Sequence, residues 1–109
     1  MSQLNDFIVQ IHDKPGVLAT RTENVQAHLA RMKGLVEAGT IVMSGPTLTT
    51  HPKPPDKGLD INGSVWLVRA NLEDEVRSLV DDDVYAKLGV WDLDNVVITP
   101  FKCAVRKPL

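Results

Sequence analysis

The stretch that decides the fold is residues 25–37, which read Val25-Gln26-Ala27-His28-Leu29-Ala30-Arg31-Met32-Lys33-Gly34-Leu35-Val36-Glu37. At about 100° per residue, its apolar side chains fall on one narrow stripe of a helix, formed by Val25, Leu29, Met32 and Val36. We therefore predict an amphipathic helix that buries this stripe. His28 lies on the flank of the stripe, so its imidazole is expected at the seam between the helix and the surface that it covers.

The segments around this helix predict a compact alternation of strands and helices. A β-branched run at 7–11 predicts the first strand, and the helical pattern spans 17–39, with Asn24 as a break or new N-cap and Gly39 as the C′ residue. The elements expected after it are a strand at 40–44 that Gly45 and Pro46 stop, a strand at 63–70, a helix that follows an N-cap at Asn71 and runs through Val80, a turn at 84–88 capped by Asp83, and a strand at 96–105. This is the β-α-β-β-α-β order of an α+β, ferredoxin-like fold, with an antiparallel sheet and both helices on one face.

The predicted strands are apolar on both sides. Phe7 and Val9 point to one face and Ile8 to the other, and Val97 and Ile98 likewise oppose each other. One layer of helices covers only one of these faces. A second copy of the chain is the simplest cover for the free face, so we expect a homodimer with a two-fold interface.

Length, charge and cysteine usage narrow the class of protein. At 109 residues the chain is expected to form a single domain over 1–109. A net charge of −2 without a basic stripe argues against nucleic acid, and no apolar run is long enough to span a membrane. Cys103 is the only cysteine and is expected as a small buried hydrophobe in the last strand, which fits a reducing compartment. With no signal-peptide pattern, we expect a cytoplasmic protein.

Residues 47–62 have neither helical nor strand periodicity. Three prolines, at positions 52, 54 and 55, favour a stiff, extended loop. A loop this long in a small domain is often functional. We expect it to reach over the mouth of a cleft or across to the partner subunit.

Short motifs along nearly the whole chain form a set in a fixed order. They are Arg21, Ala27-His28-Leu29, Leu35, Ala38-Gly39, Ser44-Gly45-Pro46, Gly63-Ser64, Asp83-Val84-Tyr85, Gly89-Val90 and Pro100-Phe101-Lys102. This set resembles the pattern of YCII-related proteins, a family of the dimeric α+β barrel superfamily, and the C-terminal residues are similar to fungal members. The resemblance implies a ferredoxin-like fold that pairs into a barrel. It also implies a His-Asp pair in a cleft, which falls here on His28 and Asp83.

This chain departs from the family pattern beside both members of the pair. Val84 stands where the family often has proline. Val25 and Gln26 stand where it often has an arginine and a proline before the histidine. The departures leave the pair intact and bear on the groups that would face a substrate.

A carboxylate beside an imidazole fixes the tautomer of the ring and supports general acid-base chemistry. We expect His28 and Asp83 within hydrogen-bond distance, roughly 2.6–3.2 Å, in a concave, partly solvated pocket. From local spacing alone, His28 also fits a satisfied core histidine and Asp83 a helix N-cap. The residues expected to bind substrate are Arg21 for an anionic group, Ser44 and the backbone near Gly45 as oxyanion donors, and Trp66 and Tyr85 as aromatic walls.

Two functions from different classes are open at this point. One is a small lyase or isomerase that needs no cofactor and no metal, acting on a cyclic or aromatic-derived metabolite of secondary metabolism. Some family relatives are linked to dehydrochlorination and to muconolactone-type isomerisation, which is analogy. The other is a non-catalytic dimeric module that binds a small molecule or assists an enzyme, with the His-Asp pair only pinning the helix.

Overall fold

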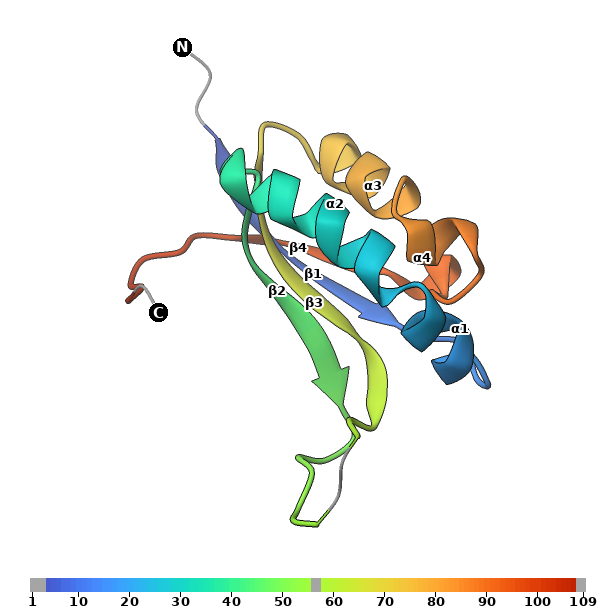
Figure 1. The fold of residues 1–109 in the computed structure, drawn as a ribbon. Coiled ribbons are helices and arrows are strands. Elements are labelled where there is room, and N and C mark those ends of the chain that lie inside the picture. Colours follow the sequence, from blue (N-terminus) through green and yellow to red (C-terminus); the bar gives the residue numbers. More distant parts are fainter. Residues whose placement is uncertain (1–3, 56–57, 108–109) are drawn as a thin grey trace.

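A computed structural model of the chain describes residues 4–55 and 58–107 (Figure 1). Its elements in order are β1 (Asn5–His12), α1 (Leu18–Glu23), α2 (Val25–Glu37), β2 (Ile41–Leu48), β3 (Ile61–Ala70), α3 (Glu73–Asp81), α4 (Val84–Lys87), the short 3-10 helix η1 (Leu93–Asn95) and β4 (Val97–Phe101). The strands form one antiparallel sheet in the order β2-β3-β1-β4. Figure 1 shows α2 and α3 side by side on one face of this sheet. The predicted ferredoxin-like α+β fold is confirmed.

The boundaries of the edge strands differ from the prediction. β2 does not stop at Gly45 and Pro46 but continues to Leu48, with Pro46 opposite Ser64. An edge strand accepts proline because one of its sides makes no ladder hydrogen bonds. Since β3 already begins at Ile61, the connection shrinks to residues 49–60. The described residues of this connection, 49–55 and 58–60, project away from the helices (Figure 1). They are therefore no lid over α2 of their own chain, and their reach toward a partner stays a prediction.

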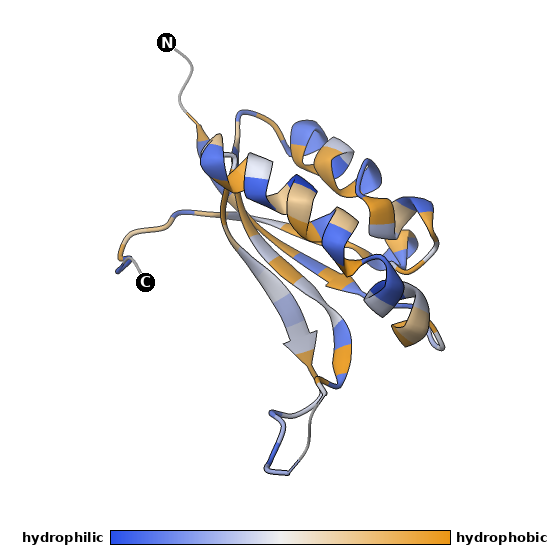
Figure 2. Cartoon of the chain, in the orientation of Figure 1, coloured by the Kyte–Doolittle hydropathy of each residue, from blue (hydrophilic) through white to orange (hydrophobic). Residues whose placement is uncertain are grey.

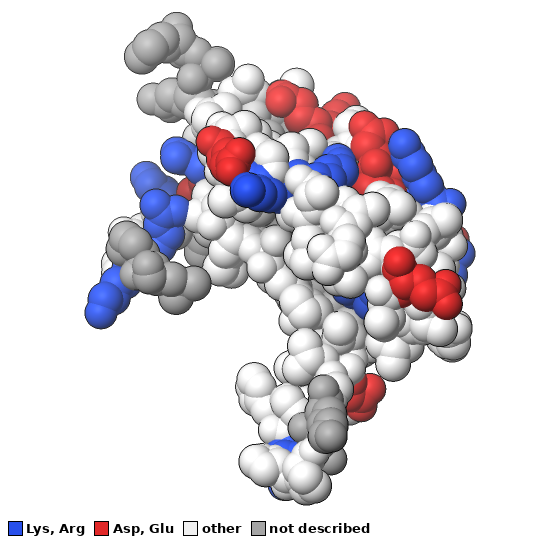
Figure 3. Space-filling view, viewed as in Figure 1, with Lys and Arg blue, Asp and Glu red and all other residues white. Residues whose placement is uncertain are grey.

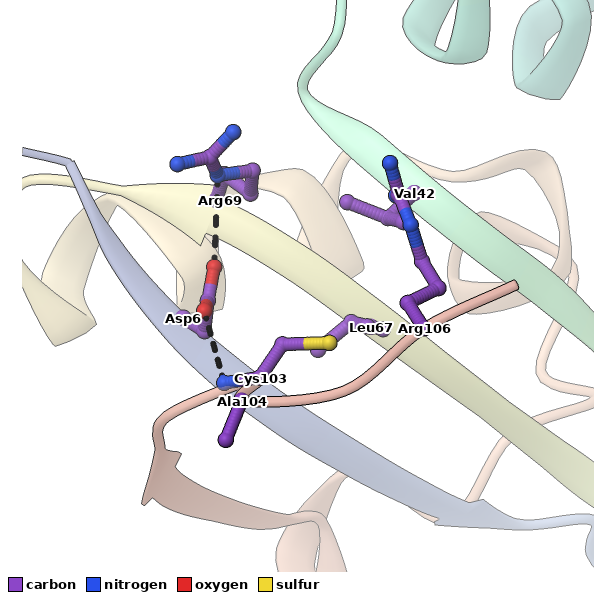
Figure 4. A pocket seen from close by; sticks show the side chains of 7 residues that line it. All are labelled: Asp6, Val42, Leu67, Arg69, Cys103, Ala104 and Arg106. Carbon is purple, nitrogen blue, oxygen red and sulfur yellow. Dashed lines mark hydrogen bonds and ion pairs between the residues drawn. The ribbon is translucent and has the colours of Figure 1, made fainter. Parts of the chain in front are cut away.

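β4 ends at Phe101, so the expectation that Cys103 lies in the last strand was wrong. Residues 102–107, here called the C-terminal tail, run past the open face of the sheet without strand pairing. The Cys103 backbone N–H donates to Asp6 Oδ2 at 3.0 Å, and Asp6 also pairs with Arg69 at 3.3 Å (Figure 4). The Asp6 carboxylate thus accepts the hydrogen bond that a backbone carbonyl would accept if the strand continued. Cys103 is half-buried rather than in the core.

The buried face of α2 is rotated relative to the predicted stripe. His28 and Met32 are buried, whereas Leu29 is 51% and Val36 46% exposed. The apolar stripe does not mark the buried face of α2, because one of the buried positions is occupied by the polar side chain of His28. This side chain is tolerated there because it pairs with Asp83.

The caps of the helices are partly as predicted. Asn24 breaks the helical segment, but its side chain donates to the Thr20 carbonyl at 2.8 Å instead of capping α2. Gly39 has the expected left-handed backbone, with φ +78°. α3 begins after Leu72 without a side-chain cap, so the predicted N-cap at Asn71 was wrong. The acidic first turn of α3 still complements the helix dipole.

The core lies between the helices and the sheet. In Figure 2 the apolar residues of α3 turn toward the sheet and its polar residues turn outward. β1 contributes the inward residues Phe7, Val9 and Ile11, as the alternation predicts. On β4, Ile98 packs on the core while Val97 is 47% exposed on the opposite side.

The face of the sheet away from the helices is apolar and hollowed. Figure 3 shows charged side chains over the helices and at the C-terminal tail, while the hollow beneath the sheet is almost uncharged. A cavity of about 600 Å³ lies between this open face and the tail. Its apolar lining includes Ile8, Met43, Leu67, Phe101 and Val105. None of the helices in residues 4–55 and 58–107 is long and apolar enough to cross a membrane.

Candidate functional site

His28 and Asp83 are in direct contact although 55 residues separate them. His28 Nδ1 on α2 lies 2.9 Å from Asp83 Oδ1 and 3.1 Å from Oδ2. Asp83 also caps α4, because its Oδ1 accepts from the Tyr85 backbone N–H at 3.0 Å. The two roles that local reasoning left open for Asp83 therefore coexist, and the distance is within the expected range.

The surroundings of the pair differ from the expectation. His28 is 8% exposed and Asp83 is fully buried, so the described residues enclose the pair more tightly than the partly solvated pocket that was expected. The pair instead joins α2 to α4 beneath the helical layer. His28 is the member that keeps contact with solvent.

Arg31 is a third member of this group, which sequence reasoning missed. Its Nη1 donates to Asp83 Oδ2 at 2.9 Å, and its Nη2 donates to the Leu79 carbonyl at 2.9 Å. Arg31 stands three residues after His28 and so projects from the same face of α2. That spacing was the available signal, but an arginine on a helix is usually a solvated residue.

The Asp83 carboxylate is ionised at neutral pH. Burial by itself would raise its pKa. Hydrogen bonds from His28, from the Tyr85 backbone N–H and from Arg31, together with the attraction of His28, outweigh burial and hold the pKa below its ordinary value of 3.8. An ionised carboxylate only accepts hydrogen bonds, so His28 Nδ1 carries a proton in this pair.

Two aromatic rings, those of Tyr85 and Trp91, pack against the imidazole. The Tyr85 ring stacks on His28 with centroids 4.3 Å apart, and Trp91 meets His28 edge-on at 6.0 Å. Trp66 in turn packs edge-on against Trp91 at 5.5 Å. Trp66 and Tyr85 were expected as aromatic walls of a substrate site. In the structure both are buried: Tyr85 packs on the histidine itself, and Trp66 lies behind it, against Trp91. Within the described residues, the buried indole N–H of Trp91 meets no acceptor.

The Tyr85 hydroxyl is also tied into the core. It donates to the Arg21 carbonyl at 3.1 Å. Burial raises the pKa of Tyr85; the charge of Asp83 adds to this rise and the Arg21 guanidinium opposes it. The hydroxyl is therefore neutral at physiological pH and acts as a donor.

Arg21 was expected to hold an anionic group, but its guanidinium is already engaged. Its Nε pairs with Asp13 at 2.8 Å, and its Nη2 donates to Ser64 Oγ at 2.7 Å and to the Gly63 carbonyl at 3.1 Å. It also lies 4.7 Å from the centre of the Tyr85 ring. Arg21 is only 5% exposed. In the single chain it joins α1 to the end of β1 and to β3, and no face of it is offered to a ligand.

Ser44 and Gly45 were expected to end a strand beside the helix that carries His28. They lie inside β2 instead, opposite Trp66 and Val65, and both are exposed. No hydrogen bond joins either of them to His28 in the described part of the chain. Their role as oxyanion donors remains a prediction.

The arrangement supports proton transfer at one atom. With Nδ1–H donating to Asp83, the lone pair of neutral His28 is on Nε2, which can accept a proton and return it. The adjacent carboxylate stabilises the imidazolium that forms in between. Among residues 4–55 and 58–107, no group of three or more His, Cys, Asp or Glu side chains is placed to hold a metal ion.

Comparison with known proteins gives consistent matches over most of the chain. The family model "YCII-related domain" matches residues 6–102. A fungal protein of Emericella nidulans, "Derivative of benzaldehyde biosynthesis cluster protein C", is 45% identical over 89 residues, which are 82% of this chain and 91% of the relative. "Fusaric acid biosynthesis protein 2" of Gibberella moniliformis is 34% identical over 101 residues, 93% of this chain and 96% of the relative.

A solved structure matches the fold as well as the sequence. It is a 5-chloro-2-hydroxyhydroquinone dehydrochlorinase from Burkholderia phenoliruptrix in complex with 2,5-dihydroxybenzoquinone. The TM-score is 0.74 at 33% identity, and the match covers 89% of this chain and 93% of the other.

Proposed function

The chain belongs to the family of YCII-related domains, and from that premise we propose that it is a small enzyme of secondary metabolism that acts on an oxygen-substituted aromatic or quinone-type ring. The reaction is a proton transfer by His28 that leads to isomerisation or elimination, without a cofactor. The observation that carries the proposal is the hydrogen bond from His28 Nδ1 to the ionised, fully buried Asp83.

The class of substrate comes from the relatives. One fungal relative is named for the biosynthesis of a benzaldehyde derivative, which contains an aromatic ring. The structural neighbour is named as a dehydrochlorinase of a hydroxylated, chlorinated ring and holds a dihydroxyquinone. A ring with several oxygen substituents suits proton transfer, because removing a proton from a hydroxyl lets a ring carbon take one up.

In the proposed reaction, His28 Nε2 removes a proton from a ring hydroxyl, and the electron pair moves into the ring. The imidazolium, stabilised by Asp83, then returns the proton to a ring carbon, which completes an isomerisation. If that carbon also bears a leaving group, loss of a second proton expels it as an anion and completes an elimination. One positioned acid-base group accelerates such a step by roughly 10²–10⁴-fold.

Deuterium exchange on 2,5-dihydroxybenzoquinone tests this directly. Each ring C–H exchanges with D₂O when a deuteron adds to the carbon and the original proton leaves, and ¹H NMR follows the loss of signal. We expect the protein to accelerate exchange and His28→Ala to lose at least about 100-fold of that acceleration. His12→Ala, at the exposed end of β1, is the matched control and should behave like the unchanged protein. Equal exchange with and without protein, or with His28→Ala, would reject the proposal.

One observation favours the second candidate, a non-catalytic binding module. The pair is buried and joins α2 to α4, which is what a purely structural pin would do. In that case His28→Ala lowers the melting temperature and there is no exchange activity to lose. Thermal unfolding and exchange measured on the same preparation separate the two candidates.

We further infer that the chain works as a homodimer that joins two open sheet faces into an α+β barrel. The support is the apolar open face, where Met43 is 53%, Val97 47% and Phe101 45% exposed. Such a contiguous apolar surface is unusual on a monomer. The hollow in Figure 3 is mostly uncharged, and the charged residues that border it are the Asp6–Arg69 ion pair and, in the tail, Arg106 and Lys107.

A further inference from the structure

The orientation of the Asp83 carboxylate is not secured by its own element. α4 is only four residues long, Val84–Lys87, and a helix this short has little stability of its own. Within it, the Tyr85 backbone N–H holds Oδ1 alone. The other oxygen, Oδ2, accepts from Arg31 at 2.9 Å, while His28 lies within 3.1 Å of both oxygens. Arg31 is thus the donor that decides where Oδ2 lies.

Arg31 is itself fixed at two points. Nη1 is on the Asp83 carboxylate and Nη2 is on the Leu79 carbonyl near the end of α3. A planar guanidinium held by two acceptors has little freedom to rotate. Because Arg31 and His28 lie one turn apart on α2, both donors approach Asp83 from the same rigid helix. The side chain of Arg31 is 26% exposed, so bulk solvent screens this contact only in part.

We propose that Arg31 is a positioning residue that orients the Asp83 carboxylate and, through it, keeps His28 in the tautomer with the proton on Nδ1. This inference rests on the proposed function in that the free lone pair on Nε2 is what serves proton transfer. Loss of Arg31 frees Oδ2 to turn, lets the carboxylate move out of line with Nδ1, and so lets the ring populate the other tautomer.

The other ionisable groups near the pair cannot replace Arg31. Tyr85 faces His28 with its ring and donates its hydroxyl to the Arg21 carbonyl. The Arg21 guanidinium lies over the Tyr85 ring and pairs with Asp13. Among the arginines and lysines of the described residues, Arg31 alone forms an ion pair with Asp83.

The test is ¹⁵N NMR of the His28 ring in the folded protein, which reads the tautomer from the two nitrogen shifts and needs no substrate. Arg31→Gln removes the charge and keeps a polar side chain. We expect a clear rise in the Nε2–H tautomer and about a tenfold loss of exchange activity. Arg31→Lys restores a cation toward Oδ2 without the second bond to Leu79, and should recover most of the Nδ1–H signal. Should Arg31→Gln not fold, Arg31→Met replaces it, because it also removes the charge and keeps a long side chain; a rise in the Nε2–H tautomer is expected, and unchanged His28 shifts would contradict the positioning role.

Arg77 provides a matched control, because it also joins a carboxylate and a carbonyl. Its Nε contacts Asp81 at 3.3 Å and its Nη2 donates to the Leu93 carbonyl at 2.7 Å. Arg77→Gln should leave the His28 shifts unchanged. If Arg31→Gln also leaves them unchanged, or if Arg31→Lys shifts them no less than Arg31→Gln, Arg31 is only a tie between helices and the inference is wrong. A tautomer change in a protein without exchange activity would support the positioning role while rejecting the proposed function.

Discussion

Asp83 accepts hydrogen bonds from three donors with two oxygens, and it does so at full burial. The donors come from two helices, α2 and α4, so one carboxylate fixes their relative position. Removing one partner of a buried charged group costs more than the pair contributes, because the remaining groups are left without compensation. The site residue that bears most on stability is therefore the acid, not the base.

Asp83→Asn should lower the free energy of unfolding by about 3 kcal/mol at pH 7. The asparagine side chain has one accepting oxygen, so its NH₂ group must face either His28 or Arg31, which are both donors. Urea denaturation followed by circular dichroism measures the change. Asp81→Asn is the matched control, because the Asp81 side chain is 47% exposed and its ion pair is worth less than about 1 kcal/mol.

The same variant gives a pH dependence with a defined sign. The folded-state pKa of Asp83 is below its ordinary value of 3.8, so its contribution is complete above that pH and is lost as pH falls through the lower folded value. The difference in unfolding free energy between the unchanged protein and Asp83→Asn should be fully present at pH 5. Below about pH 3.8 it should shrink. A difference that does not change down to pH 2.5 would mean that the carboxylate is not stabilised by these partners.

At the scale of single residues, the sequence predicted the His28–Asp83 pair but not the residues that hold the site residues in place. His28 and Asp83 were predicted because a family resemblance marks them, and the cap at Asp83 follows from local pattern. Arg31 and Asp13 were not predicted, since each looks like an ordinary surface charge until its partner across the fold is known. Arg21 was expected to bind an anionic group, which overlooked the carboxylate of Asp13 that already pairs with it.

At the scale of single elements, strand β4 has one face on the core and one on the open side. Ile98 lies opposite Val9 and packs beneath the helices, whereas Val97 lies opposite Gln10 and is 47% exposed. This alternation shows that Ile98 faces the core and Val97 the open side, which the sequence alone did not decide. It also gives a pair of identical substitutions, one residue apart, with opposite expected effects.

Val97→Glu should yield a folded monomer, and Ile98→Glu should destabilise the fold itself by more than about 3 kcal/mol. The first places a charge in the proposed dimer interface, and the second places one in the core. Sedimentation velocity at micromolar concentration and thermal unfolding read the two outcomes. A Val97→Glu protein that sediments as the unchanged dimer, or an unchanged protein that is a folded monomer, would contradict the barrel interface.

The helix α2 illustrates where pattern reading of an element fails. Its existence, its break at Asn24 and its end at Gly39 were predicted, because propensity and C′ glycine geometry are local. Its buried face was not, because His28 occupies a core position that only a partner from α4 makes tolerable. Likewise, β2 continues through Pro46 because it is an edge strand, which is a property of the whole sheet.

At the scale of the whole molecule, the sheet separates two different surfaces. The helical side holds the buried pair and its aromatic surroundings, and the open side holds an apolar hollow partly covered by the C-terminal tail (Figures 1 and 3). The element order and the mismatch between two apolar faces and one helical layer were visible in the sequence. The path of the tail and the cavity of about 600 Å³ beneath it were not, because residues 102–105 were predicted to continue the last strand, which in the structure ends at Phe101.

These two surfaces make the position of a bound ring the most direct test of the central claim, which is that His28 acts on the substrate. The measurement is a crystal structure of the protein with 2,5-dihydroxybenzoquinone. The predicted result is a ring oxygen roughly 2.6–3.2 Å from His28 Nε2, with Nδ1 still on Asp83. A quinone bound only in the cavity on the open sheet face, with Nε2 out of its reach, would contradict the claim.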